Sequence, residues 1–306
     1  MITADREPGL THRKLRKFWA SYGVGYLFVL PAFTLLVVFM VYPFFVSLYY
    51  SLMKWDGIRP EKTFIGFQNY TNLLQDDIFW QAIKHNGIWM LVGSGGSISL
   101  GLFLAILIWS RPRGFLFFRT VFFLPQVLGA GILGVLWNII YQPRKGLLFL
   151  IGDAMNWEAL KYSPLASYDL ALWAVLIAAI WASVGFYFVI FVAGLQNVNM
   201  ELIDAAQVDG ANSVQRFFHV IIPQLSHVLT LVIVLAMIGS IKVFGLVWAM
   251  TQGGPANGSE TLATYAYRQF SILSEVGYSS SITMVLALLA LTVTLILLRV
   301  RERSEG

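Results

Sequence analysis

Long apolar runs separated by short polar stretches dominate the chain. A helix needs about 20 apolar residues to cross the hydrocarbon core of a bilayer, and six stretches reach that length. The six predicted spans cover residues 24–52, 87–109, 120–141, 170–195, 227–250 and 282–298. Pro31 and Pro43 should bend or end the first span locally, and Pro125 should interrupt the third. The pattern predicts an all-α integral membrane protein with six transmembrane helices.

Composition supports this class. The 306 residues are 58% hydrophobic and 12% charged, whereas soluble domains are about 45–50% apolar and about 25% charged. The absence of cysteine excludes disulfides, thiolate metal sites and cysteine nucleophiles. The first apolar run is too long for the core of a cleavable signal peptide, so the first span is expected to remain in the mature protein.

Basic residues set the expected orientation. Those on one side of the six-span arrangement are Arg13, Lys14, Arg16, Lys17, Arg111, Arg113, Arg119, Arg299, Arg301 and Arg303. Basic residues on the other side are spread over longer loops and mixed with acids. By the positive-inside rule, the N-terminal tail 1–23, the C-terminal tail 299–306 and the loop between the fourth and fifth spans should lie in the cytoplasm. The sequence thus predicts a multi-pass protein of the inner or plasma membrane.

That loop, residues 200–223, is a polar island between two apolar runs. Residues 201–208 favour a helix, and Asp209-Gly210 should end it because glycine tolerates a positive φ. Ser213 can cap a second short helix, which Pro223 should close. The apolar face of this helix is expected to consist of Phe217, Val220 and Ile221. The simpler alternative is an ordinary membrane-surface loop.

The same stretch resembles a known family. The residues that carry the likeness are Asp204, Ala205, Ala206, Asp209, Gly210, Ala211, Phe217 and Pro223. They closely resemble the "EAA" loop of permease subunits of binding-protein-dependent ABC importers, in which this loop couples to a cleft of the cytoplasmic ATPase. Asp204 stands where the family usually has glutamate, which is one methylene longer. Either Asp204 reaches the usual partner or Glu201, on the same helical face, shares the role.

Other segments resemble the same family. Residues 251–255 read Thr-Gln-Gly-Gly-Pro and resemble the Thr-Gly-Gly-Gly-Pro of its sugar-type permeases. Gly253, Gly254 and Pro255 are therefore assigned to a loop that faces the binding protein. Residues 41–44 and 64–70 resemble the first-span Tyr-Pro and the Phe-x-Gly-Leu-x-Asn-Tyr segment of the family. The resemblance covers nearly the whole chain and implies one permease domain, 24–298, with the type I ABC importer fold.

The resemblance also implies partners. They are a second permease subunit in a heterodimer, a dimeric cytoplasmic ATPase, an extracytoplasmic solute-binding protein and the lipid bilayer; nucleic acid is not expected. The chain has no Gly-x-x-x-x-Gly-Lys-Ser/Thr motif, so it should not cradle ATP phosphates by that route. We expect no cofactor, metal or enzymatic activity in this chain, with ATP and Mg²⁺ bound by the partner ATPase.

Residues inside the spans indicate the transported solute. Sugars bind to hydroxyls and amides together with aromatic faces. The candidates for the pore are Gln126, Asn138, Trp181, Ser183, Phe186, Tyr187, Ser240, Lys242 and Phe244. By similarity, the family places substrate contacts near Ser183 and Ser240. The alternatives are lipid packing for the aromatic residues, helix–helix contact for the serines and, for Lys242, extension to the membrane surface instead of into a wet cavity.

Other functions stay open. No predicted span contains Asp or Glu, which disfavours an ion-coupled secondary transporter. A lipid-modifying enzyme would need an acid, a histidine and a nucleophile that converge at one interface, and the sequence indicates none. Within the importer class, the substrate could instead be a polar non-sugar such as a glycerophosphodiester or a polyamine.

Overall fold

The computed structural model describes residues 25–109 and 113–305, so the predicted N-terminal tail 1–23 lies outside the described residues. The elements in chain order are η1 (Val37–Val41), α2 (Tyr42–Ser51), β1 (Met53–Lys54), β2 (Thr63–Phe64), α3 (Gln68–Leu74), α4 (Asp77–Ile88), η2 (Trp89–Ser94), α5 (Gly95–Leu107), α6 (Phe115–Val127), α7 (Ala130–Ile140), α8 (Leu147–Ala154), η3 (Glu158–Lys161), η4 (Pro164–Ala166), α9 (Ala171–Leu195), α10 (Met200–Val208), α11 (Ser213–Arg216), η5 (Phe217–Ile221), α12 (Ile222–Gln224), α13 (Ser226–Ile241), α14 (Gly245–Met250), α15 (Leu262–Ser271) and α16 (Val276–Glu305).

Four membrane spans follow from these helices, or up to six if each of two bent pairs is one span. Four are long and apolar enough to cross a bilayer, namely Gly25–Ser51, Asp77–Leu107, Ala171–Leu195 and Val276–Leu297. Two more are bent pairs, α6 with α7 at 100° and Ser213–Gln224 with Ser226–Ile241 at 74°. The all-α class and the six-span pattern are confirmed. The last helix, α16, continues to Glu305 and so includes most of the predicted C-terminal tail.

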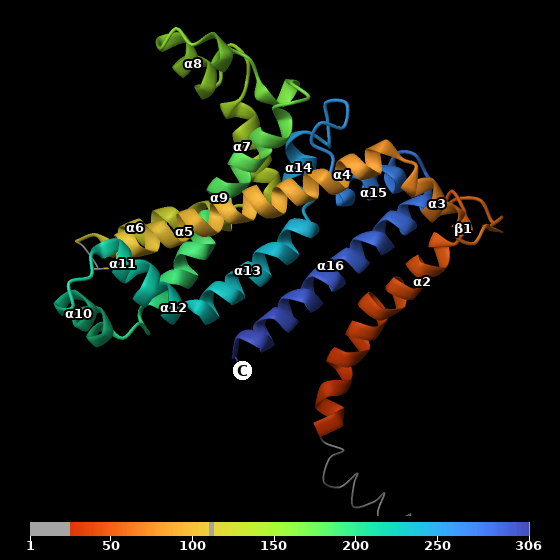
Figure 1. The fold of residues 1–306 in the computed structure, drawn as a ribbon. Coiled ribbons are helices and arrows are strands. Elements are labelled where there is room, and N and C mark those ends of the chain that lie inside the picture. Colours follow the sequence, from red (N-terminus) through yellow and green to blue (C-terminus); the bar gives the residue numbers. More distant parts are fainter. Residues whose placement is uncertain (1–24, 110–112, 306) are drawn as a thin grey trace, which may run out of the picture.

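The first helix runs unbroken past both of its prolines. Immediately before Pro43, the chain forms the π-turn η1, in which the Tyr42 amide donates to the Val37 carbonyl. A proline removes one amide donor from the helix, and a widened turn can absorb the mismatch. The helix therefore ends at neither Pro31 nor Pro43, and of the two predicted effects only a local bend is left. Figure 1 shows α2 diverging from α16 toward the start of the chain, and this helix is exposed along most of its length.

The third and fifth predicted spans are both divided. Pro125 lies inside α6, and the break follows at Leu128 and Gly129, after which α7 turns away. The expected interruption of the third span is confirmed. The fifth span was predicted as one helix over 227–250, but α13 ends at Ile241 and α14 begins at Gly245. That prediction of continuity was wrong.

A side chain from another helix accounts for the break after Ile241. The Asn86 amide in α4 donates hydrogen bonds to the carbonyls of Ser240 and Ile241 at 3.0 and 3.2 Å. The last carbonyls of a helix have no partner within the helix, and Asn86 supplies one. Its own carbonyl oxygen accepts from the Leu262 amide at 2.9 Å. One buried asparagine therefore joins α4, α13 and the start of α15.

The fourth span, α9, forms the centre of the bundle and packs against α5 and α6. Its residues Phe188 and Phe191 are completely buried. Gly185 allows the close crossing with α6, because a Cβ at this position would overlap the Phe122 carbonyl group. Gly101 of α5 is similar, since a Cβ there would lie 2.9 Å from the Phe188 nitrogen. Small residues at such crossings are typical of membrane helix packing.

The two ends of the bundle differ. At one end lie α10, α11 and α12, and at the other lie α3, α15 and the β1–β2 pair (Figure 1). In that pair, Met53 lies opposite Phe64 and Lys54 opposite Thr63, in antiparallel register. Asp76 caps α4 and accepts hydrogen bonds from the hydroxyls of Tyr265 and Tyr278. Asp76 thus ties α4, α15 and α16 together at the β1–β2 end.

Candidate functional site

The segment between α9 and α13 folds as a helix–turn–helix. Asn199 caps α10, with its side chain accepting from the Glu201 amide at 2.8 Å. The helix ends at Val208, and the chain turns at Gly210, which has φ +85°. The Gly210 amide donates to the Gln207 carbonyl at 3.1 Å and the Ala211 amide to the Ala206 carbonyl at 2.9 Å. These two bonds form a Schellman motif, in which a glycine in left-handed conformation closes the helix.

The second helix begins one residue earlier than predicted. Asn212 is the cap, because its side chain accepts from the Gln215 amide at 2.9 Å while the Gln215 side chain accepts from the Asn212 amide at 2.8 Å. Ser213 is the first helical residue. The Asn-x-x-Gln spacing is a capping-box pattern readable in the sequence. The helix also passes Pro223 and ends at Gln224, so the expectation that Pro223 closes it was off by one residue.

Exposure divides this segment into an outer and an inner side. The carboxylates of Glu201, Asp204 and Asp209 are exposed, as are Ala205, Gly210 and Pro223, while Ala206 and Ala211 are half-buried. The face formed by Phe217, Val220 and Ile221 instead packs into the core of this chain, against residues of α9 and α13. The apolar face therefore attaches the helix–turn–helix to its own bundle.

Five other large apolar side chains are exposed on the same segment, and the sequence analysis did not single them out; Met200 is 54% and Leu202 52% exposed. Val208 is 88% exposed, Val214 is 64% exposed and Phe218 is 59% exposed. Val208 directly precedes the turn, and Val214 is the second residue of the helix that Asn212 caps. Next to the exposed carboxylates, these residues make the outer side of the helix–turn–helix both acidic and apolar.

Two of the pore candidates lie in one seam of serines. The Ser240 hydroxyl of α13 lies 2.5 Å from that of Ser94, and the Ser183 hydroxyl of α9 lies 2.7 Å from that of Ser97. All four line a cavity of about 180 Å³, together with Tyr187. Ser240 is 2% exposed. The structure thus brings Ser183, Tyr187 and Ser240 together, in an arrangement that also satisfies the serines by helix–helix contact.

The remaining pore candidates are dispersed. Gln126 is exposed near the end of α6. Asn138 of α7 donates to the Gly134 carbonyl at 2.9 Å and lines a different cavity. Trp181 is 42% exposed and lines an apolar groove with residues of α5 and α6. Phe186 packs into the α5–α9 core. None of these four lines the serine cavity.

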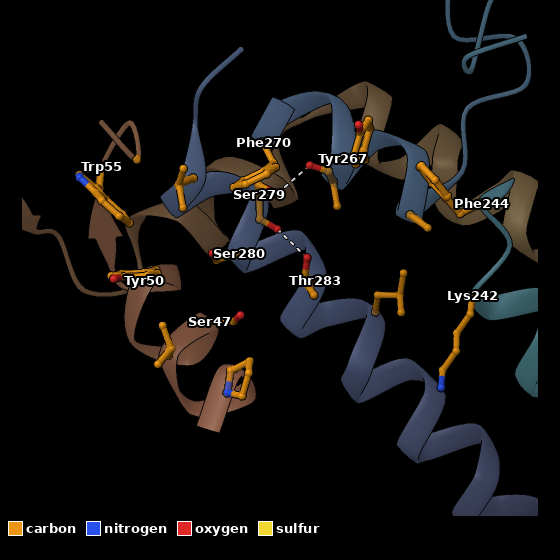
Figure 2. A pocket seen from close by; sticks show the side chains of 17 residues that line it. Ser47, Tyr50, Trp55, Lys242, Phe244, Tyr267, Phe270, Ser279, Ser280 and Thr283 are labelled. Atoms are coloured by element: carbon orange, nitrogen blue, oxygen red, sulfur yellow. Dashed lines mark hydrogen bonds between the residues drawn. The ribbon is translucent and has the colours of Figure 1, made fainter. Parts of the chain in front are cut away.

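Lys242 and Phe244 line a larger cavity, of about 710 Å³. Lys242 is exposed and lies directly after the last residue of α13, not within a continuous fifth span as predicted. Figure 2 shows Lys242 and Phe244 on one side of this cavity and Ser47 and Tyr50 of α2 on the other.

The loop after α14 is held by a buried ion pair. Glu260 is 0% exposed and pairs with the guanidinium of Arg268, although neither carboxylate oxygen receives a well-aligned hydrogen bond from the described residues. Burial raises the pKa of the Glu260 carboxyl, and Arg268 partly opposes this. Gly253 has φ +86°, and a Cβ there would lie 2.5 Å from the Glu260 carboxylate. Gly254 and Pro255 continue this non-helical loop, as predicted.

In the described part of the chain, the histidines do not gather at one metal-binding place. His85 in α4 hydrogen-bonds the Glu260 carbonyl at 2.8 Å, whereas His219 in η5 is exposed and hydrogen-bonds the Gln215 carbonyl at 3.0 Å. Within residues 25–109 and 113–305, no three His, Cys, Asp or Glu side chains lie close enough together to hold a metal ion.

Comparison with known proteins gives consistent results. The model of a family described as "Binding-protein-dependent transport system inner membrane component" matches residues 14–304. The probable ABC transporter permease protein YurN of Bacillus subtilis is 33% identical over 279 residues, which cover 89% of this chain and 94% of that protein. The multiple sugar-binding transport system permease protein MsmF of Streptococcus mutans is 29% identical, with 97% of this chain and 100% of that protein covered.

A solved structure has the same fold. It is a bacterial ABC transporter involved in the import of the acidic polysaccharide alginate, and one of its chains superposes with a TM-score of 0.78 at 20% identity. The superposition covers 95% of this chain and 99% of that chain.

Proposed function

Because the chain belongs to the family of binding-protein-dependent transport system inner membrane components, we propose that it is the transmembrane permease subunit of an ATP-driven importer for a carbohydrate. The observation that carries this proposal is the helix–turn–helix at one end of the bundle. Its exposed carboxylates and outward apolar residues offer a compact surface to another protein. The name of MsmF, a sugar-transport relative over its full length, supports the substrate class.

The proposed mechanism places the helix–turn–helix and the binding-protein loop on opposite sides of the membrane. In the proposal, residues 200–223 lie in the cytoplasm and contact a dimeric ATPase, which binds ATP and Mg²⁺. Both termini lie on the same side, as the distribution of basic residues favours. A second permease subunit completes the pathway, and a binding protein delivers the solute to the end of the bundle that carries residues 251–260.

No bond chemistry is assigned to this chain. The helix–turn–helix is rigid, since a Schellman turn and a capping box fix its two helices. It is also packed into α9 and α13 through Phe217 and Ile221. A displacement of the helix–turn–helix by the ATPase therefore moves the helices that carry Ser183 and Ser240. The bundle would alternate between two packings, and nucleotide state would bias which one is populated.

The serine cavity is the proposed place for the hydroxyl groups of the carbohydrate. Its hydroxyls and Tyr187 can exchange their present hydrogen bonds for bonds to a solute when the helices separate. Ser183→Leu and Ser240→Leu should each raise the KM for sugar uptake by about tenfold, the equivalent of one lost hydrogen bond. Unchanged uptake kinetics in both variants would remove these residues from the pathway.

The class of transporter is tested by its energy source. Uptake of radiolabelled disaccharides should require the binding protein and collapse when cellular ATP is depleted. Uptake that survives ATP depletion but disappears with the ion gradient would indicate an ion-coupled carrier and refute the proposal. Import of a glycerophosphodiester or a polyamine in place of sugars would keep the importer class and replace the substrate.

A further inference from the structure

The cavity that contains Lys242 is built like a ligand site. Its volume of about 710 Å³ lies within the range of about 300–1,000 Å³ common for small-molecule sites. The aromatic side chains that line it are Tyr50, Trp55, Phe244, Tyr267 and Phe270. They come from the first span, the segment after it, α15 and the link between α13 and α14 (Figure 2). Such flat faces match the apolar faces of sugar rings.

Hydroxyl groups in this cavity are available to a ligand. Ser47, Ser280 and Tyr267 line it, and their hydroxyls form no hydrogen bond with another described residue. Thr283 also lines the cavity, but its hydroxyl donates to the Ser279 carbonyl at 3.0 Å. The cavity therefore combines aromatic faces with three free hydroxyls.

The positive charge of Lys242 in this cavity has no described carboxylate as an ion-pair partner. Lys242 is the one ionisable lysine, arginine, aspartate or glutamate among the lining residues. A second cation, Lys62, lies close to two of the lining rings, 4.8 Å from the centre of Tyr50 and 4.3 Å from that of Trp55. The cavity is consequently suited to an anion.

The cavity extends from Val276, at the end of the last span, toward the middle of that span. Leu286 lines the same cavity, and it lies halfway along the Val276–Leu297 span. Ten residues of helix separate it from Val276, which is a distance of about 15 Å. Phospholipid headgroups lie at the bilayer surface, so a headgroup could reach only the Val276 end of the cavity, and the test below distinguishes a lipid from a solute.

We propose that this cavity binds a carbohydrate-sized solute that carries a carboxylate or a phosphate. Lys242 pairs with the anionic group, while Tyr50, Trp55 and Phe244 contact the apolar part of the solute. This inference rests on the proposed import function and narrows its substrate class to acidic carbohydrates and related phosphorylated polyols. The site is distinct from the serine cavity, with which it shares no lining residue.

The test uses the full chain, purified with its co-expressed partners, in nanodiscs of phosphatidylcholine. Two matched probe pairs, glucuronate with glucose and glycerol 3-phosphate with glycerol, are titrated by tryptophan fluorescence and thermal shift. We expect at least one charged probe to bind, with affinity that falls as salt rises, and its neutral partner to bind at least about tenfold more weakly, the equivalent of one charge-assisted hydrogen bond.

Variants assign the effect to Lys242. Lys242→Gln should weaken the charged probe at least about tenfold, and Lys242→Arg should retain its binding because the positive charge is kept. Lys84→Gln is the matched control, since Lys84 is exposed in α4 and does not line the cavity. It makes the same change in net charge and should leave binding unchanged.

Three results would overturn the inference. One is equal binding of charged and neutral probes, and another is a Lys242→Gln variant that behaves like Lys84→Gln. The third is a higher melting temperature of the complex in phosphatidylglycerol nanodiscs together with no binding of either charged probe. That result would indicate that a lipid occupies the cavity. ATP-dependent sugar import is measured separately. If the complex still imports sugar with ATP but binds neither charged probe, the inference that the cavity holds an anionic solute is wrong and the proposed import function stands.

Discussion

The turn at Gly210 offers the sharpest test of the helix–turn–helix. Its φ of +85° lies in the left-handed region, and no atom lies within 4 Å of where a Cβ would be. Gly210→Ala therefore adds no steric overlap with the rest of the protein and tests backbone conformation alone. Holding a non-glycine residue in this region costs about 1–2 kcal/mol. Such a cost lowers the population ratio of the turned conformation about five- to thirtyfold.

Two further substitutions bracket that effect. Gly210→Pro fixes φ near −65° and removes the amide that donates to the Gln207 carbonyl, so it should abolish the turn. Gly210→Asn should retain more activity than alanine, because asparagine tolerates the left-handed region. Gly87→Ala is the control, since Gly87 lies within α4 with open space at its Cβ position.

The assay is sugar-stimulated ATP hydrolysis by the assembled importer in liposomes, with membrane insertion checked in parallel. Stimulation should decrease in the order wild type, Gly210→Asn, Gly210→Ala and Gly210→Pro, while Gly87→Ala stays at the wild-type level. A properly inserted Gly210→Pro complex that keeps full sugar stimulation would refute the assignment of the turn to coupling.

Two more predictions concern stability. Gly185→Ala should lower the free energy of unfolding by about 1–3 kcal/mol, because its Cβ overlaps the Phe122 carbonyl group; a melting temperature equal to that of Gly131→Ala, where space is open, would contradict this. Arg268→Ala should leave Glu260 as an unpaired buried carboxylate and destabilise by about 3–5 kcal/mol. Because burial raises the Glu260 pKa above its ordinary value, the folded state holds the Glu260 proton more tightly than the unfolded chain does, and stability should fall as pH rises through that raised pKa. Melting curves between pH 4 and 8 should show this loss in Arg268→Ala and not in Arg268→Ala/Glu260→Gln; equal pH dependence in both would be evidence against the reasoning.

Local sequence rules worked where the cause is local. Six spans followed from the length of apolar runs, and the turn at Gly210 followed from the conformation that glycine permits. The cap of the second helix was assigned one residue late, because both Asn212 and Ser213 are good caps and the Gln215 partner of Asn212 was not considered. In that case the missing information was already in the sequence.

Contacts between distant residues decided the rest. The fifth span breaks at Lys242 because Asn86, 154 residues away from Ser240, takes the last carbonyls of α13. That break leaves Lys242 in the cavity shared with α2 and α16. The same kind of pairing sets Ser94 against Ser240 and buries Glu260 beside Arg268.

The sequence by itself thus determined that the chain spans a membrane, which apolar runs supply its spans, and which family it resembles. Hydropathy and glycine conformation depend on residues close together in the chain, so both can be predicted from the order of residues alone. Only the tertiary structure decided which face of the second short helix points inward, which serines meet and where the free ammonium lies. Those features depend on how helices rotate about their axes and cross, and interlocking side chains from separate parts of the chain fix both.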